Sequence, residues 1–443
     1  MRPDLVIAAA RAVVDGEERA CDVAVADGRI VGVHEPGTGD AAEVVRLDGD
    51  VVLLPGLVDT HVHVDEPGRT EWEGFAHATR AAAAGGVTTG VDMPLNSVPA
   101  TVDVAALETK RRAAEGQCHV DVGFWGGAVP ENLHDLASLW DAGVFGFKCF
   151  LVDSGVDEFP ALGEAELEKV MEQLSSFGGL LLVHAEDPEA VSPCPAGATR
   201  YADFLASRPE MAEVSAVSAV VEAARRTGCR THVVHVSAAG ALPVLAAAHE
   251  AGVPVTAETC PHYLALSAEE VPDGATEFKC CPPVRGADNR DLLWAGLAAG
   301  TLGCVVSDHS PAPVGLKAVD SGSFADAWGG ISSLQLGLPV VWTAARERGF
   351  GLADVARWMA SGPADRAGLR RKGRITVGND ADFCVLAPEE TFVVDPVRLA
   401  HRNPLTPYAG RRLGGVVRQS WLRGHPVDTD GPPRGRLLRR GEG

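Results

Sequence analysis

The sequence predicts an α/β protein in which a (β/α)8 barrel carries a small β-sandwich domain built from both chain termini. Through the middle of the chain, eight apolar runs alternate with Ala- and Leu-rich helical stretches, which favours a parallel sheet closed into a barrel. Near both ends, short strand-like runs are separated by turn residues instead. The 443 residues exceed the roughly 250 that a barrel alone occupies. An open doubly wound sheet is the alternative.

The two terminal regions have the turn chemistry of a small sheet. Asp-Gly pairs at 27–28 and 48–49 are hairpin signals. The strand-like runs are residues 5–7, 22–25, 29–31, 44–47 and 51–54 near the start, and 373–375, 381–386 and 414–417 near the end. We therefore expect a β-sandwich domain of residues 1–55 and 371–443, and a barrel of residues 56–370.

The central runs and the helices between them follow in chain order. The expected strands are residues 57–63, 87–93, 119–126, 144–150, 180–184, 231–236, 253–259 and 304–308. The expected helices, recognised by apolar residues at helical spacing, include residues 75–84, 104–114, 164–175, 215–226 and 241–249. Because the carboxyl ends of barrel strands meet at one mouth, polar residues that end these runs mark the expected active site.

The charge composition favours some classes of binding partner over others. The 60 acidic residues outnumber the 39 basic ones, and the net charge of -21 disfavours binding to nucleic acid or anionic membranes and favours a small molecule. The basic tail, residues 434–440, is expected to be a solvated end. The ten cysteines form no C-x-x-C pair, and the chain has neither a signal-peptide pattern nor an apolar stretch of about 18 residues. We expect a protein of the reducing cytoplasm.

Two histidines, His61 and His63, end the first barrel run. Side chains two residues apart in a strand point to the same side, so the two imidazoles can converge on one cation at the barrel mouth. Alone, such a pair more often has a structural role.

Four later runs also contain or end in a metal-capable residue: Lys148, His184, His235 and Asp308. Each alone has an ordinary explanation, such as a histidine bonded to a backbone carbonyl or an aspartate that caps a helix. Burying so many ionisable groups around one mouth would be costly without a compensating charge, which metal ions supply. The sequence therefore predicts a metal site.

Lys148 needs a separate explanation, because an ammonium ion repels metal cations and cannot coordinate them. A lysine between two metals must be neutral or modified. Carboxylation by carbon dioxide would convert its amine to a carbamate, an anionic ligand with two oxygens. An ordinary ion pair with Asp308 or Asp92 is the alternative.

These motifs together resemble those of the cyclic amidohydrolases, the group of dihydroorotase, dihydropyrimidinase (hydantoinase) and allantoinase. The resemblance extends from the segment PGLVDTHVH at 55–63 to GNDADF at 378–383. It implies that His61 and His63 bind the more buried of two metals, and that carboxylated Lys148 bridges both. His184 and His235 would bind the second metal. Asp308 would bind the first and act as general acid and base.

The resemblance also implies the reaction, hydrolysis of a cyclic amide, and its cofactor, two divalent ions. Zinc suits a site rich in histidine, and manganese, cobalt or iron(II) would accept the same ligands. Members of the group are often homotetramers, so a homo-oligomer is expected. The distant alternative is a non-catalytic scaffold, because some relatives have lost the metal ligands; here all six positions are filled.

Within the group, the sequence most resembles the allantoinase branch, in segments 66–75, 93–97, 147–151, 306–311 and 327–331. Dihydroorotases usually have an arginine two residues after the second histidine and a histidine four residues after the aspartate; here these are Asp65 and Ala312. Hydantoinases commonly have a tyrosine soon after the lysine, where this chain has Leu-Val-Asp-Ser at 151–154. The resemblance implies opening of allantoin to allantoate, with hydantoinase, dihydropyrimidinase or dihydroorotase activity as alternatives.

Three further residues are candidate substrate contacts. Asn96 matches a family position that contacts substrate, although asparagine is equally common in turns. Cys281 lies where relatives bind substrate through backbone groups, so its main chain is the expected contact. Arg69 is the nearby cation that could hold a carboxylate.

Overall fold

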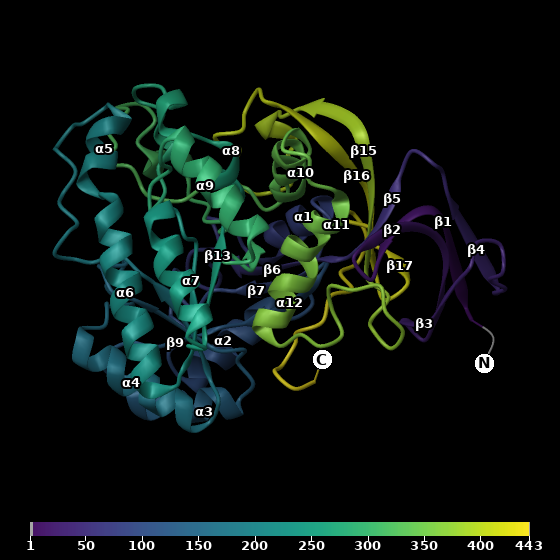
Figure 1. The fold of residues 1–443 in the computed structure, drawn as a ribbon, viewed down its shortest axis with the longest axis horizontal. Coiled ribbons are helices and arrows are strands. Elements are labelled where there is room, and N and C mark those ends of the chain that lie inside the picture. Colours follow the sequence, from purple (N-terminus) through teal and green to yellow (C-terminus); the bar gives the residue numbers. More distant parts are fainter. Residues whose placement is uncertain (1–2, 443) are drawn as a thin grey trace.

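The structure, a computed structural model that describes residues 3–442, alternates short strands with helices along most of the chain (Figure 1). The strands are β1 (Leu5–Val14), β2 (Glu17–Ala26), β3 (Arg29–His34), β4 (Glu43–Leu47), β5 (Val52–Pro55), β6 (Leu57–Val62), β7 (Val87–Asp92), β8 (Asp121–Phe124), β9 (Gly126–Gly127), β10 (Phe147–Phe150), β11 (Leu180–His184), β12 (Arg230–Val233), β13 (Val255–Thr259), β14 (Cys304–Val305), β15 (Phe383–Val393), β16 (Arg412–Leu422) and β17 (His425–Pro426). The α-helices are α1 (Phe75–Ala84), α2 (Val104–Ala114), α3 (Leu136–Asp141), α4 (Glu164–Ser176), α5 (Tyr201–Ser207), α6 (Glu210–Thr227), α7 (Leu242–Glu250), α8 (Pro261–Ala265), α9 (Ala287–Ala298), α10 (Gly337–Glu347), α11 (Leu352–Ala356) and α12 (Gly362–Ala367).

The central strands are parallel and form two sheets, β6-β7-β8 and β14-β13-β12-β11-β10-β9. A single residue, Trp125, separates β8 from β9, and its backbone N–H donates to the carbonyl of Asp92 in β7. At the other margin, Val62 in β6 forms an isolated parallel bridge with His309, which follows β14. Each of the eight runs expected from the sequence contains a strand, and the protein is an α/β protein as predicted.

The segments at the two chain ends share one eight-stranded sheet. Its strand order is β17-β16-β15-β5-β1-β2-β3, with β4 paired to β1. In Figure 1 the purple N-terminal strands occupy the right end of the molecule, and the yellow strands β15 and β16 lie beside them. These strands enclose their own apolar cluster, which includes Ile7, Val23, Leu53 and Phe383. Strands from opposite ends of the chain therefore bury one core together.

Two local expectations were wrong. The Asp-Gly pair at 48–49 does not make a hairpin: β4 and β5 both run parallel to β1, in which Leu5 pairs with Glu43 and Ala12 with Leu53. The long strand β1 thus accommodates two short strands in succession. Residues 373–375 form no strand, because Gly373 turns the chain at φ 73°. A side chain there would also collide with the carbonyl of Ala360.

The basic tail is packed rather than free. Its backbone bonds to the chain around β8, where Gly435 N–H donates to the Cys118 carbonyl and Leu438 N–H to that of Val122. The side chain of Arg440 lies over the Trp140 ring at 3.5 Å. The expectation of a solvated end holds only for the other arginine side chains, which are exposed.

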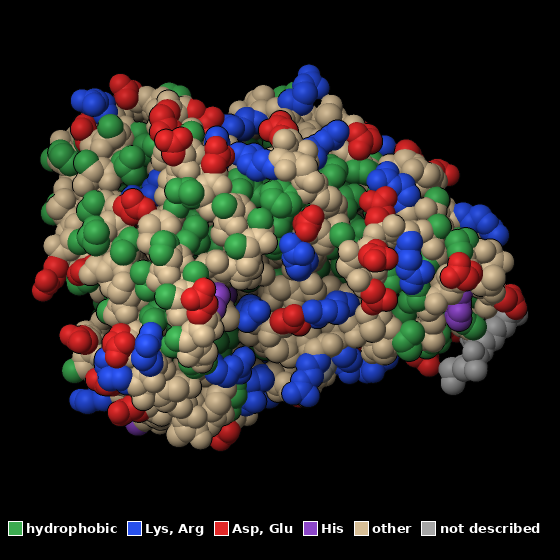
Figure 2. Space-filling model, in the orientation of Figure 1, with side chains coloured by type: hydrophobic (Ala, Val, Ile, Leu, Met, Phe, Trp, Pro, Cys, Tyr) green, Lys and Arg blue, Asp and Glu red, His purple; other side chains and the backbone are tan. Residues whose placement is uncertain are grey.

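The surface mixes both signs of charge. Figure 2 shows acidic and basic side chains interspersed over the visible face. Among the helices that the structure describes, none combines the length and apolar composition needed to cross a membrane.

A buried ionic cluster ties the terminal segment to the central strands. The ammonium of Lys372 is 2.7 Å from carboxylate oxygens of Asp121 in β8 and of Asp382 just before β15, and 2.9 Å from Asp380. Arg423 reaches Asp121 at 2.6 Å. Because the Lys372 side chain is 3% exposed, its charge and those of its partners must satisfy each other.

We expect Lys372→Met to lower the free energy of unfolding by about 3–5 kcal/mol, because it leaves buried carboxylates without a counter-charge. Urea unfolding followed by circular dichroism measures the change. The control is Arg374→Met, which breaks the exposed pair of Arg374 with Asp365 and should cost less than about 1 kcal/mol. Equal losses in the two variants would contradict this role of the cluster.

Candidate metal centre

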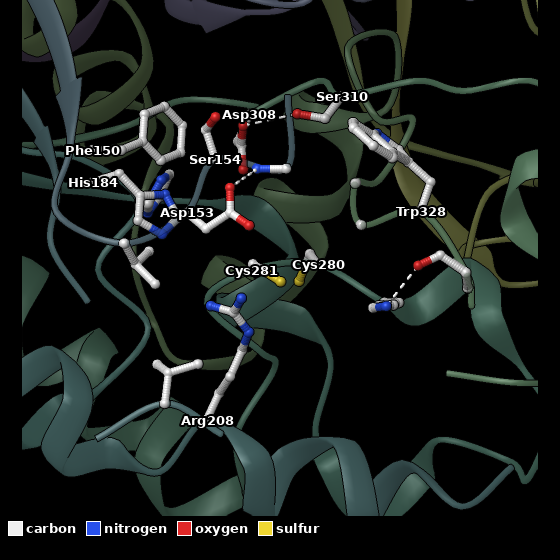
Figure 3. Close-up of a pocket in the computed structure, with 18 of the residues that line it drawn as sticks. Phe150, Asp153, Ser154, His184, Arg208, Cys280, Cys281, Asp308, Ser310 and Trp328 are labelled. Atoms are coloured by element: carbon white, nitrogen blue, oxygen red, sulfur yellow. Dashed lines mark hydrogen bonds between the residues drawn. The ribbon is translucent and has the colours of Figure 1, made fainter. Parts of the chain in front are cut away.

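Six metal-capable side chains line one cavity of about 660 Å³. They are the residues selected from the sequence: His61, His63, Lys148, His184, His235 and Asp308. Each lies in a central strand or in the few residues after one, so the parallel order of the strands carries them to the same end of the sheets. Figure 3 shows His184 and Asp308 among the side chains that line this cavity.

The innermost group is His61, His63 and Asp308. Oδ1 of Asp308 lies 3.2 Å from Nε2 of His61 and 3.5 Å from Nε2 of His63. One ligand atom from each of the three residues falls within 4.8 Å of the others, and all three are buried. Two imidazole nitrogens and one carboxylate oxygen at this spacing suit a divalent transition ion.

His184 and His235 lie against this group. The His235 ring centroid is 5.3 Å from that of His61 and 4.5 Å from that of His184. Nδ1 of His235 is buried and has no hydrogen-bond partner within the described residues. A buried nitrogen without a partner costs free energy unless a ligand satisfies it, so this atom also suits a metal.

Lys148 lines the same cavity as these histidines. Its Nζ is 4.9 Å from the Phe150 ring centroid, and within residues 3–442 it forms neither a salt bridge nor a hydrogen bond. Neither ion pair considered as an alternative is formed among the described residues: Asp92 pairs with Lys110 at 2.6 Å, and Asp308 lies against His61 and His63 instead. Burial lowers the pKa of Lys148 to about 8, so its neutral amine is more populated than that of an exposed lysine.

Burial also sets the charges of the other donors. It lowers the pKa of His63 to about 4 and that of His235 well below its usual value, so both rings are neutral at pH 7. For Asp308, burial alone would raise the pKa, but the neighbouring histidines outweigh it and hold the pKa well below its usual value. His63 and His235 therefore offer neutral imidazoles and Asp308 offers a carboxylate, the forms that bind metal.

Two buried glutamates that the sequence analysis missed hold ring nitrogens of these histidines. Oε1 of Glu258 lies 2.7 Å from Nδ1 of His61, and its other oxygen lies 3.0 Å from Nε2 of His232. Oε2 of Glu186 lies 2.7 Å from Nε2 of His184. The available signals were weak: Glu258 is an acidic residue inside a run expected to be a buried strand, and Glu186 follows His184 by two residues.

Two of the three candidate substrate contacts line the cavity, and the third does not. Asn96 lines the cavity with its amide nitrogen 3.5 Å from Nδ1 of His63, and Cys281 lines it as well. Arg69 is not among the residues that line the cavity. Its guanidinium pairs with Glu158 and donates to the backbone carbonyl of Asn96 at 2.7 Å. Its charge is neutralised by Glu158, so it holds the Asn96 turn rather than facing the cavity.

Three residues of the site have left-handed backbone: Asn96 at φ 65°, His235 at φ 41° and Asp308 at φ 44°. L-residues rarely adopt this conformation, which costs about 1–3 kcal/mol at such positions. The surrounding fold therefore offsets this conformational cost, and the three side chains line the cavity.

Comparison with known proteins agrees with this geometry. A sequence model described as the amidohydrolase family matches residues 52–427. The chain is 57% identical to an allantoinase of Streptomyces avermitilis over 443 residues, which cover 99% of each chain. It is 39% identical to an allantoinase of Escherichia coli O1:K1 / APEC, over 96% of this chain and 95% of that one.

Solved structures agree on the fold. An L-hydantoinase (dihydropyrimidinase) from Arthrobacter aurescens has a TM-score of 0.92 at 27% identity, with 99% of this chain and 100% of that chain covered. A D-hydantoinase from a Bacillus sp. AR9 has a TM-score of 0.89 at 27% identity, with 99% of each chain covered. Since the family model matches far more than half of the chain, this protein belongs to the amidohydrolase family.

Proposed function

We propose that this chain is a metal-dependent hydrolase that opens the hydantoin ring of allantoin to give allantoate. The similarity to an allantoinase over 99% of both chains carries the substrate assignment. The convergence of six donor side chains on one cavity supports the hydrolytic chemistry. A related hydantoinase or dihydropyrimidinase activity is the second candidate, because solved structures with those names share the fold with TM-scores near 0.9.

In this proposal the cavity holds two divalent ions. His61, His63 and Asp308 would hold the first, His184 and His235 the second, and Lys148 would bridge them as a carbamate. The carbamate forms when the neutral lysine amine adds to carbon dioxide, which makes a C–N bond and releases a proton. Nζ of buried Lys148 and Nδ1 of His235 have no hydrogen-bond partner in the described part of the chain, which supports this assignment. Zinc is the expected metal, with manganese, cobalt or iron(II) as the alternatives.

When bound, the two ions would lower the pKa of a water molecule toward about 7 and polarise the ring carbonyl. Asp308 would move the proton. Its low pKa keeps it a carboxylate that can accept a proton from the attacking water. It would then donate that proton to the ring nitrogen as the C–N bond breaks, so that the leaving nitrogen becomes part of a neutral ureido group.

The walls of the cavity would orient the substrate. Asn96 would contact it through its side-chain amide and Cys281 through its main chain. Arg69 would act indirectly, because it bonds to the Asn96 carbonyl outside the cavity. Asp153 and Ser154 line the cavity after the bridging lysine, where hydantoinases commonly have a tyrosine. This difference favours allantoin over the simpler hydantoins.

The finer architecture belongs to the same proposal. The central strands, residues 56–370, would close into a (β/α)8 barrel, which the bridge of Val62 to His309 supports. Residues 1–55 and 371–443 would form a β-sandwich domain, which their separate apolar cluster supports. The ten free thiols fit a reducing cytoplasm, and a homotetramer is the expected assembly.

The purified enzyme should turn over allantoin with a kcat/KM at least about tenfold higher than hydantoin, dihydrouracil or dihydroorotate, since the difference in contacts is worth about 1.4 kcal/mol or more. Release of the ring-opened product from each substrate, measured at equal enzyme concentration, gives the ranking. A preference for any other member of the panel would reject allantoin as the substrate.

Lys148→Ala should lose bound metal and activity, because it removes the proposed bridging ligand. Short-chain carboxylic acids should restore part of both, since a free carboxylate can occupy the space of the carbamate. Metal analysis and turnover with and without acetate or propionate measure the effect. His184→Ala is the control, because a carboxylate does not replace an imidazole there. Full metal content in unrescued Lys148→Ala would contradict the bridge.

Cys281→Ala should leave KM for allantoin within about twofold, because its backbone is the proposed contact. Asn96→Ala should raise KM about tenfold, the effect of losing one hydrogen bond of about 1–1.5 kcal/mol. Steady-state kinetics of the two variants make the comparison. A large KM increase in Cys281→Ala would instead indicate that the thiol of Cys281, and not its backbone, contacts the substrate.

A further inference from the structure

His184 is held in one plane by its neighbours. Its ring stacks on that of Phe150 at a centroid distance of 4.6 Å and an interplanar angle of 19°, while His235 meets it edge-on. Stacking fixes the plane of an imidazole but not which nitrogen faces the cavity, because a half-turn of the ring keeps the same plane. Another group must therefore determine which of the two ring nitrogens faces the cavity.

That group is Glu186, whose side chain is fully buried. Its Oε2 lies 2.7 Å from Nε2 of His184. An ionised carboxylate only accepts hydrogen bonds, so Nε2 carries the proton and the lone pair lies on Nδ1. Within the described residues, Nε2 is the one ring nitrogen of His184 with a hydrogen-bond partner. Nδ1 is therefore the atom left to bind an ion.

Arg208 fixes Glu186 in turn. It follows α5, and its Nη1 donates to the same oxygen, Oε2 of Glu186, at 2.6 Å. Arg208 also lines the cavity, and Figure 3 shows its guanidinium pointing toward Cys281, with His184 nearby. The other oxygen, Oε1 of Glu186, has no partner among the described residues. The histidine and the arginine thus share one oxygen, which holds the carboxylate in place.

We propose that Glu186 and Arg208 are positioning residues for the second metal ion. Glu186 sets the proton of His184 on Nε2, and Arg208 holds Glu186 from the cavity side. This inference rests on the proposed function, because it assumes two ions. It predicts a selective effect: loss of either residue weakens the ion held by His184 and His235 and spares the ion held by His61, His63 and Asp308. Neither Glu186 nor Arg208 touches His61, whose ring is held by Glu258 instead.

The chain supplies a matched control. Glu213 and Arg285 form a second buried pair, with Oε1 of Glu213 2.6 Å from Nη2 of Arg285. Glu213 also accepts bonds from the backbone N–H groups of Ser237 and Ala238, after the strand end that carries His235. It contacts no ring nitrogen of the candidate ligands. Glu213→Gln therefore perturbs a buried pair close to the site without touching the tautomer of His184.

The experiment measures zinc dissociation constants of the full-length protein by competition with a chromophoric chelator. Wild type should release two zinc ions with separable constants. Glu186→Gln should weaken one of them by about 10–100-fold, the usual cost of losing an outer partner of a metal ligand, and leave the other within about threefold. Glu186→Ala should weaken it further, because glutamine keeps an oxygen that can accept from Nε2. Glu213→Gln should leave both constants within about threefold.

A second variant keeps the test decisive if Glu186→Gln does not fold. Arg208→Gln should weaken the same zinc site, with the other site and the circular dichroism spectrum unchanged. Unchanged constants in Arg208→Gln or in a folded Glu186→Gln would overturn the inference, as would an equal weakening of both sites or an equal effect of Glu213→Gln. Wild type that binds no zinc, manganese or cobalt would instead reject the proposed function.

Discussion

One electrostatic constraint governs this structure: several ionisable side chains are buried at one point with too few partners of their own. Asp308 faces two imidazoles, and among residues 3–442 buried Lys148 has no counter-ion within hydrogen-bonding distance and Nδ1 of His235 has no partner. Arranging such groups without a cation is unfavourable, and left-handed backbone at His235 and Asp308 adds to the cost. The cavity is therefore built for a charge that the polypeptide does not contain.

The rest of the fold positions these side chains in two ways. Parallel strands bring the donors to one end of the sheets, and buried carboxylates behind them orient the rings. Glu258 is shared between His61 and His232, so it ties one donor to the strand core. Glu186 is shared with Arg208, so it ties another to the cavity wall. The two histidine groups are thus held by different carboxylates.

Much of this could be predicted from the sequence, because strands and helices leave periodic patterns. The bounds of α1 and α2 agree with the expected ranges, and the donors stood out as polar residues that end apolar runs. Glu186 and Arg208 could not be found in this way, since their pairing depends on how the long segment after β11 and helix α5 fold back toward the strand end. The Asp-Gly pair at 48–49 wrongly predicted a hairpin of β4 with β5. A turn signal is local, whereas both strands pair with β1, which lies far back in the chain. Arg69 misled for the same reason: its partner, Glu158, is distant in sequence.

The shared terminal sheet has a consequence for biosynthesis. Strand β5 pairs with β1 on one side and with β15 on the other, so Leu53 contacts both Ala12 and Val385. The ribosome makes the first 55 residues long before β15 emerges, at about 5–20 residues per second. Until then β5 presents an open edge that can pair with other chains. Folding of the C-terminal segment therefore covers the edge that the N-terminal strands leave open during synthesis.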